Sequence, residues 1–132
     1  MATVRLLADH ELSPEAQAVF VDIRATRQSD FVNNFWRALA HDPVTLKRTW
    51  ESVKAVMAPG VLEPKVKEMI YIAVSVANAC PYCVHSHTAS ARAKGMSDAE
   101  HQELLAIIGM ASETNRLVTA LGVPVDDAFE VR

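Results

Sequence analysis

The chain has 132 residues, of which 50% are hydrophobic and 22% charged, so it can build a substantial core and is not intrinsically disordered. Its 13 basic and 16 acidic residues leave a net charge of −3 without any basic block, which argues against nucleic acid as the main partner. The N-terminus lacks the pattern of a secretory signal, and the most apolar run, residues 69–79, is too short to span a bilayer. We therefore expect a cytoplasmic protein without a membrane partner.

The first half of the chain carries repeated helix signals. Ser13 is suited to an N-cap, Pro14 to the first helical position and Glu15 to the first turn. Apolar residues then recur at helical spacing, and Asp42 followed by Pro43 provides another start signal. The helices predicted here occupy residues 15–28, 29–40 and 44–58.

A central helix is predicted at the start of the second half. Pro-Gly at 59–60 interrupts the chain, and Pro64 begins a segment, residues 64–79, in which almost every position from Met69 onward is apolar. The segment shows no alternation of period two and has no comparable run to pair with, so a helix is favoured over a strand. Because a helix that is apolar all round is normally buried all round, we expect this one to lie at the centre of the fold.

Further helix signals follow toward the C-terminus. Pro81 restarts the chain, and Gly95 is suited to the position just after a helix. Ser97 and Glu100 form a capping-box pattern before the last apolar segment. The predicted helices occupy residues 81–95 and 99–110. Residues 112–122 continue the last helix or form a following one, and residues 123–132 are a loose tail. Together these signals predict an all-α protein, a single domain of about six helices over residues 1–132.

The two cysteines of the chain lie three residues apart in the stretch "ANACPYCVHSHTA", residues 77–89. If Pro81 is the first helical residue, Cys80 is the N-cap and Cys83 is at N3, where free N–H groups and the helix dipole favour a thiolate. The spacing also permits a disulfide. His87 lies one helical turn after Cys83, where its imidazole can take the thiol proton. Dithiol redox chemistry is the leading interpretation.

A metal site and inert core cysteines are the two alternatives. Cys80, Cys83, His85 and His87 could supply four ligands, which is the number that a structural zinc site requires. However, His85 and His87 are separated by roughly 200° around a helix, so their side chains point in nearly opposite directions. The remaining histidines stand alone in the sequence. We therefore expect neither a metal nor another cofactor.

The spacing of four residues carries a family resemblance. Glu68 lies twelve residues before Cys80, and His87 lies four residues after Cys83. In this pattern the sequence resembles the alkylhydroperoxidase D-type members of the carboxymuconolactone decarboxylase-like family. The resemblance implies an all-helical alkylhydroperoxidase D-like fold and a homotrimer or homohexamer.

The resemblance also implies a function, a thiol-dependent peroxidase of the antioxidant type. Cys83 would attack a hydroperoxide, and Cys80 would then condense with the resulting sulfenic acid to form a disulfide. An external dithiol reductant, a thioredoxin-like or lipoyl-bearing protein, would restore the pair. Glu68 and His87 would form the proton relay that deprotonates Cys83. A dithiol oxidoreductase without peroxidase activity and a metal-binding or redox-sensing protein are the alternative functions.

The family pattern differs here at one position and leaves two points open. Some peroxidase members carry a histidine immediately before the second cysteine, whereas this chain has Tyr82; His85 is a candidate substitute, and both are candidate substrate-pocket residues. Reasoning from the helix end favours Cys80 as the attacking thiol, whereas the resemblance favours Cys83. In a straight antiparallel hairpin Glu68 and His87 lie out of step, so the relay predicts a bend, a large crossing angle or a neighbouring subunit.

Overall fold

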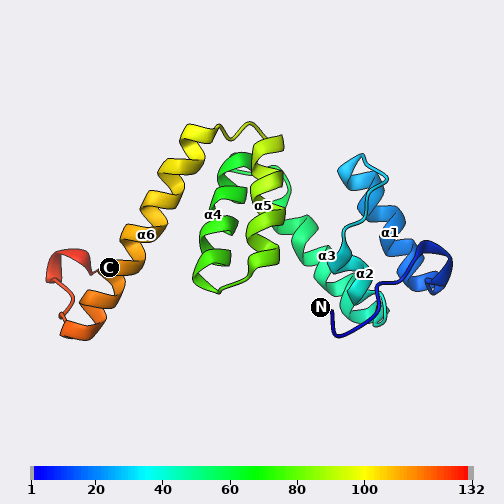
Figure 1. Cartoon of the computed structure of the whole chain (residues 1–132), viewed down its shortest axis with the longest axis horizontal. Helices are drawn as coiled ribbons and strands as arrows, with labels where there is room; N and C mark the ends of the chain where they lie inside the picture. The colour runs from blue at the N-terminus through cyan, green and yellow to red at the C-terminus, as the bar shows by residue number, and fades with distance from the viewer. Residues whose placement is uncertain (1, 131–132) are drawn as a thin grey trace. The chain divides into compact units, whose positions relative to one another are not determined.

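The computed structural model describes residues 2–130, and these residues form helices and no strands (Figure 1). The α-helices are α1 (Pro14–Arg27), α2 (Asn34–Leu39), α3 (Pro43–Met57), α4 (Pro64–Ala77), α5 (Pro81–Ala93) and α6 (Asp98–Leu121). Two short 3₁₀ helices flank them, η1 (Asp9–Glu11) and η2 (Asp127–Phe129). The predicted all-α class is confirmed, with six α-helices in the described part of the chain.

The predicted helix over residues 29–40 is shorter than expected. Gln28 adopts a left-handed conformation (φ 51°) and ends α1, and the backbone N–H of Phe31 then donates to Ser29 Oγ at 3.2 Å. Asn33 is the N-cap of α2, so residues 29–33 form a connection instead of a first helical turn. Local side-chain hydrogen bonds of this kind compete with helix formation.

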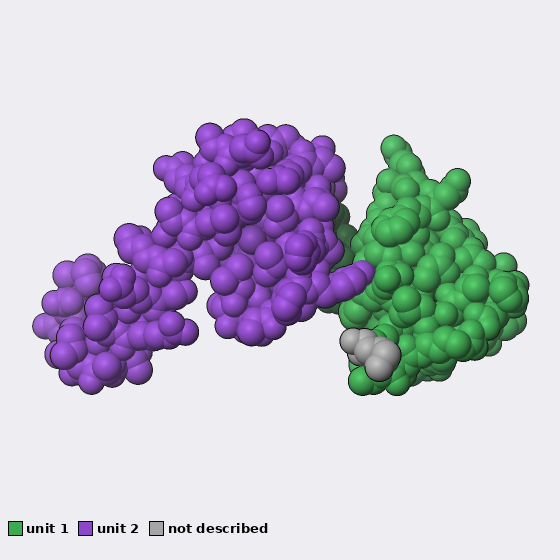
Figure 2. All heavy atoms as spheres, viewed as in Figure 1, with its two compact units in different colours: residues 1–58 green, residues 59–132 purple. Residues whose placement is uncertain are grey.

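Packing divides the chain into two compact units, residues 1–58 and 59–132 (Figure 2). The expectation of one domain stays a prediction. In the first unit, α1 packs on α3 around a cluster of buried side chains. Trp36 and Trp50 are 2% and 3% exposed and meet edge to face, with ring centroids 5.5 Å apart. The cluster comprises Leu7, Ala16, Val19, Phe20, Ile23, Val32, Trp36, Ala40, Leu46 and Trp50.

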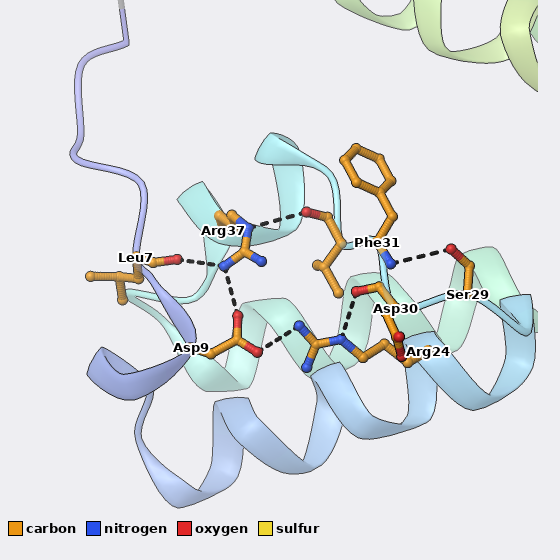
Figure 3. A network of polar contacts seen from close by, with 8 residues as sticks. Leu7, Asp9, Arg24, Ser29, Asp30, Phe31 and Arg37 are labelled. Atoms are coloured by element: carbon orange, nitrogen blue, oxygen red, sulfur yellow. Dashed lines mark hydrogen bonds and ion pairs between the residues drawn. The ribbon is translucent and has the colours of Figure 1, made fainter.

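A network of charged groups ties the N-terminal segment of the first unit to its helices (Figure 3). The Asp9 carboxylate accepts from Arg24 at 2.6 Å and from Arg37 at 3.0 Å, and these hydrogen bonds, that of Arg24 first, lower the pKa of Asp9. Arg37 also donates to the Leu7 carbonyl at 2.9 Å, and Arg24 donates to the Asp30 carbonyl at 2.9 Å. Each arginine thus joins a side-chain acceptor to the backbone of a connecting segment.

The second unit is built around the antiparallel pair of α4 and α5, and α6 also contacts α4 (Figure 1). Its buried apolar cluster is small, consisting of Ile72, Ala91, Met96 and Leu104. The expectation that α4 is buried all round is wrong for the single chain: Ile70 and Val74 are 49% and 52% exposed. The buried residues of α4 are Glu68, Ile72 and Ser75, and α4 is therefore covered on only part of its surface by the described residues.

Helix α6 also exposes many apolar side chains, among them Ile107, Met110, Leu117 and Leu121. By length and composition alone this helix of 24 residues could cross a bilayer. One helix of this kind is weak support for a membrane protein, because helices of soluble proteins can have the same length and composition.

Candidate active site

The site begins at the turn between α4 and α5. Asn78 is the C-cap of α4, and Ala79 follows in a left-handed conformation with φ of 53°. The Ala79 N–H donates to the Val76 carbonyl at 3.1 Å, and the Cys80 N–H donates to the Ser75 carbonyl at 2.9 Å. These two bonds form a Schellman motif, which ends α4. The backbone of Cys80 is therefore fixed by α4 at the point where α5 begins.

Ala79 occupies a position where glycine is the usual residue, and Ala79→Gly is expected to stabilise the protein by about 0.5 kcal/mol. The left-handed conformation costs a non-glycine residue roughly 1 kcal/mol or slightly more, and the greater freedom of glycine in the unfolded chain offsets part of the gain. Ala77→Gly, in the last turn of α4, is the matched control and is expected to destabilise by about 1 kcal/mol. Urea unfolding of both variants and the wild type measures the free energy of unfolding. A change of the same sign in both variants would contradict the prediction.

The two cysteines occupy the positions predicted from the sequence. Pro81 is the first residue of α5, Cys80 is its N-cap, and Cys80 Sγ accepts from the Cys83 N–H at 3.3 Å. The two residues form a disulfide, with Cα atoms 5.3 Å apart, so the structure represents the oxidised protein. Both cysteines are only partly buried. A reactant in solution can therefore reach the helix end that favours a thiolate.

A second cluster surrounds the carboxylate of Glu68, which lies on α4 and is 3% exposed. Its Oε2 lies 2.7 Å from Nδ1 of His87. Its Oε1 accepts from Ser90 Oγ at 2.8 Å and is also bound by Lys94 Nζ. His87 and Ser90 lie on α5 and Lys94 is its C-cap. They are spaced three and four residues apart and so lie along one face of that helix.

The charge state of Glu68 determines which His87 nitrogen carries a proton. Burial by itself raises the pKa of Glu68. Hydrogen bonds from His87, Lys94 and Ser90, together with the positive charge of Lys94, lower the pKa by more than burial raises it, to about 2. The carboxylate is ionised at neutral pH and can only accept hydrogen bonds, so Nδ1 of His87 must donate. In the neutral imidazole Nε2 then keeps its lone pair and can accept a proton.

Tyr71 fixes the plane of the His87 ring. The two rings are stacked, with centroids 3.4 Å apart and planes at 15°. Tyr71 lies on α4, three residues after Glu68, so the same helix holds the imidazole through its face and through Nδ1. With 21% of its side chain exposed, His87 is held in orientation while remaining partly accessible.

The Glu68–His87 contact forms despite the offset that was expected between the two residues along the helix axes. Glu68 lies nine residues before the end of α4 and His87 six residues after the start of α5, an offset of roughly 5 Å along the axes. The two side chains bridge this offset within one chain. Their helices, α4 and α5, lie side by side (Figure 1). The contact lies within one chain, so the neighbouring subunit named among the three expectations is not needed to make it.

Residues 43–126, which include this site, match the model of the carboxymuconolactone decarboxylase family. The chain belongs to this family. A crystal structure described as an alkylhydroperoxidase AhpD core from Rhodospirillum rubrum has 67% sequence identity and a TM-score of 0.96. The superposition covers 100% of this chain and 99% of that one. The resemblance to alkylhydroperoxidase D-type members and the predicted fold are both confirmed.

Two curated proteins show more limited similarity to this family member. "Uncharacterized protein 4 in cox locus" of Paracoccus denitrificans is 33% identical over 60 residues, which cover 46% of this chain and 51% of that protein. A protein named (R)-2-haloacid dehalogenase, from Pseudomonas putida, is 23% identical over 105 residues, which cover 80% of this chain and 35% of that protein. The chain thus spans about half, or less, of the length of these relatives.

Of the candidate residues, the structure brings Glu68 and His87 together and joins Cys80 to Cys83. It places Tyr82 and His85 on the exposed surface of α5, with Tyr82 44% exposed. The contacts that the structure gives the Glu68 carboxylate come instead from His87, Ser90 and Lys94. A role for either residue in a substrate pocket stays a prediction.

Sequence reasoning missed three residues of the site: Tyr71, Ser90 and Lys94. One signal for two of them was present, because Ser90 and Lys94 follow His87 at helical spacing on one face. Tyr71 carried no such signal, since an aromatic residue in an apolar helix indicates only packing.

The structure gives no grouping of ligands around the cysteines. Within residues 2–130, no three side chains of the His, Cys, Asp and Glu types lie close enough together to hold a metal ion.

Proposed function

We propose that this chain is a thiol-dependent peroxidase that reduces hydroperoxides through a cycle between the Cys80–Cys83 dithiol and its disulfide. The observation that carries the proposal is the pair of cysteines joined at the start of α5, on the helix whose His87 is held by an ionised Glu68. The family and the name of the 67%-identical protein, alkylhydroperoxidase AhpD core, support the same reaction class.

In the first step, the Cys83 thiolate attacks one peroxide oxygen of ROOH. The S–O bond forms and the O–O bond breaks, the sulfur is oxidised to a sulfenic acid, and the alkoxide leaves as ROH after taking a proton. The Cys80 sulfur then attacks the sulfenic sulfur, a disulfide forms and water leaves. An external dithiol supplies two electrons and two protons to restore the reduced pair.

His87 and Glu68 would move the proton in this cycle. Nε2 of His87 takes the Cys83 proton and returns it to the alkoxide, while Nδ1 stays hydrogen-bonded to Glu68 at 2.7 Å. Because Nδ1 donates to the carboxylate throughout, the ring keeps its orientation in the imidazolium that exists between these two transfers. We assign the first attack to Cys83 because His87 lies one helical turn from it.

Cys80 has a different advantage. Its sulfur accepts the Cys83 N–H at 3.3 Å at the positive end of α5. This contact stabilises a Cys80 thiolate when the external dithiol opens the disulfide, so Cys80 is suited to resolve the sulfenic acid and to leave during reduction.

The test is a peroxide challenge of the reduced protein, followed by mass spectrometry of the peptide that contains residues 80–83. We expect one equivalent of hydroperoxide to convert the dithiol into the disulfide, with a mass loss of two hydrogens and one equivalent of alcohol released. A dithiol that persists in folded protein under stoichiometric peroxide would overturn the proposal. If the cysteines form a disulfide only by exchange with another disulfide, and not with peroxide, the result would instead favour the alternative, an oxidoreductase without peroxidase activity.

The exposed apolar side chains of the second unit support a homo-oligomer, which we propose to be a trimer or hexamer. Ile70 and Val74 on α4, with Met110 and Leu117 on α6, are each about half exposed in the single chain, which is unfavourable for a stable monomer. Light scattering at micromolar concentration measures the mass, and a monomer would contradict the proposal. A thioredoxin-like or lipoyl-bearing protein as reductant, and the cytoplasm as location, are proposals as well.

A further inference from the structure

The two oxygens of the Glu68 carboxylate serve different partners. Oε2 holds Nδ1 of His87 at 2.7 Å, whereas Oε1 accepts from Ser90 Oγ at 2.8 Å and pairs with Lys94 Nζ. Lys94 also donates to Ser90 Oγ at 3.0 Å, which closes a triangle of contacts around Oε1. The buried carboxylate thus lies between the ammonium group of Lys94 and the imidazole of His87.

Lys94 is well placed for this contact. It is the C-cap of α5, where a positive charge interacts favourably with the helix dipole, and its N–H donates to the Ser90 and Ala91 carbonyls at 3.1 Å. Its side chain is 38% exposed, whereas that of Glu68 is only 4% exposed. The lysine stem therefore reaches inward from the surface and delivers its charge to a carboxylate that water scarcely contacts.

The charge of Lys94 matters for His87. A carboxylate without a counter-ion would act fully on the neighbouring imidazole and favour its protonated form, which cannot accept a proton from a thiol. With Lys94 on the other oxygen, the positive charge of the lysine offsets the negative charge of the carboxylate. The carboxylate still orients Nδ1 of His87. We propose that Lys94 is a positioning residue: it holds Glu68 in place as an anion and lets His87 remain a neutral imidazole with a free Nε2.

Several other titratable groups on α4, α5 and α6 have contacts of their own. Tyr71 contacts His87 through its ring face. Between α4 and α6, Lys65 pairs with Glu100 at 2.8 Å, and Arg92 of α5 contacts Asp98 at 3.4 Å. The Glu68 carboxylate contacts His87, Ser90 and Lys94, and of these Lys94 supplies the ammonium group.

The importance of Lys94 for catalysis rests on the proposed function, but the effect on His87 can be measured without turnover. The readout is the ¹⁵N spectrum of the His87 ring in the disulfide form, followed against pH and assigned with His87→Asn. We expect the wild-type ring, where it is neutral, to carry its proton on Nδ1. In Lys94→Met the midpoint of ring protonation is expected to rise by roughly one pH unit. Lys94→Arg keeps the positive charge and is expected to have a midpoint close to that of the wild type.

The rate of disulfide formation by peroxide should also be measured against pH. The pH at which this rate falls on the acid side should move in the same direction by a similar amount. Lys54→Met is the matched control, because it removes the charge of a lysine in the other unit, paired with Asp22, and should move neither readout. An unchanged midpoint in folded Lys94→Met would overturn the proposal. A shifted midpoint in a protein without peroxidase activity would support the role of Lys94 and reject only the proposed function.

A double variant covers the case in which Lys94→Met does not fold. Glu68→Gln combined with Lys94→Met removes both charges and leaves no unpaired ion in the interior. If Lys94 neutralises Glu68 in the wild type, removing the pair should change the midpoint by only a few tenths of a pH unit. A fall of a full unit or more would show that the Glu68 charge acts on His87 without compensation and would overturn the proposal.

Discussion

Replacing Cys83 with serine is expected to lower the rate of peroxide consumption by on the order of 1,000-fold or more, because the variant loses its nucleophile. A serine hydroxyl is not ionised at neutral pH and cannot be oxidised to a sulfenic acid or joined to Cys80. The prediction depends on the position of Cys83 in the first turn of α5, one helical turn before His87. Stopped-flow measurement of peroxide loss with reduced protein gives the rate directly.

Cys80→Ser is the matched control for this experiment. If Cys83 attacks first, this variant should still consume one equivalent of peroxide at a rate close to that of the wild type and then stop. A sulfenic acid should accumulate on Cys83, where a carbon nucleophile can trap it for mass spectrometry. The reverse pattern would assign the attack to Cys80, and an unchanged rate in both variants would reject the cysteine cycle.

Glu68→Gln is expected to remove a large part of the pH dependence of stability in the acid range. The pKa of Glu68 is about 2 in the folded protein, against 4.5 for an unperturbed glutamate. A carboxyl whose pKa is lowered by folding stabilises the protein above the unfolded value, and this contribution is lost as pH falls from about 4.5 toward 2. Between pH 7 and pH 2 the wild type should therefore lose on the order of 3 kcal/mol more than the variant.

Urea unfolding at pH 7, 4 and 2 measures this difference, because the other carboxyl groups are common to both proteins. Glu103→Gln, on the exposed surface of α6, is the matched charge change and should retain the acid dependence of the wild type. An equal acid dependence in wild type and Glu68→Gln would contradict the buried ionised carboxylate. The same variant should form the disulfide about 100-fold more slowly if Glu68 orients the base.

Local chemistry near the cysteines was readable from the sequence. Pro81 at the first helical position predicted the N-cap, and the short spacing of Cys80 and Cys83 permits the disulfide that the structure contains. The capping box of Ser97 and Glu100 likewise predicted the start of α6. These features depend on contacts within three or four residues, so they follow from the order of the residues alone.

Long-range contacts could not be obtained in the same way. Glu68 was suggested only by a family resemblance, and its partners Ser90 and Lys94 lie 22 and 26 residues away. Tyr71 was missed because no local pattern indicates which ring it will stack on. The expected burial of α4 also depended on unknown neighbours, since Val74 is apolar and yet 52% exposed in the single chain.

The sequence by itself determined the helical class, most of the helix starts and the placement of two thiols at a helix N-terminus, because hydrophobic periodicity, caps and prolines act over one or two turns. Only the tertiary structure decided that Glu68 is buried, ionised and shared between His87 and Lys94. The physical reason is that burial and charge pairing belong to the packing of α4 against α5, which a linear pattern does not specify.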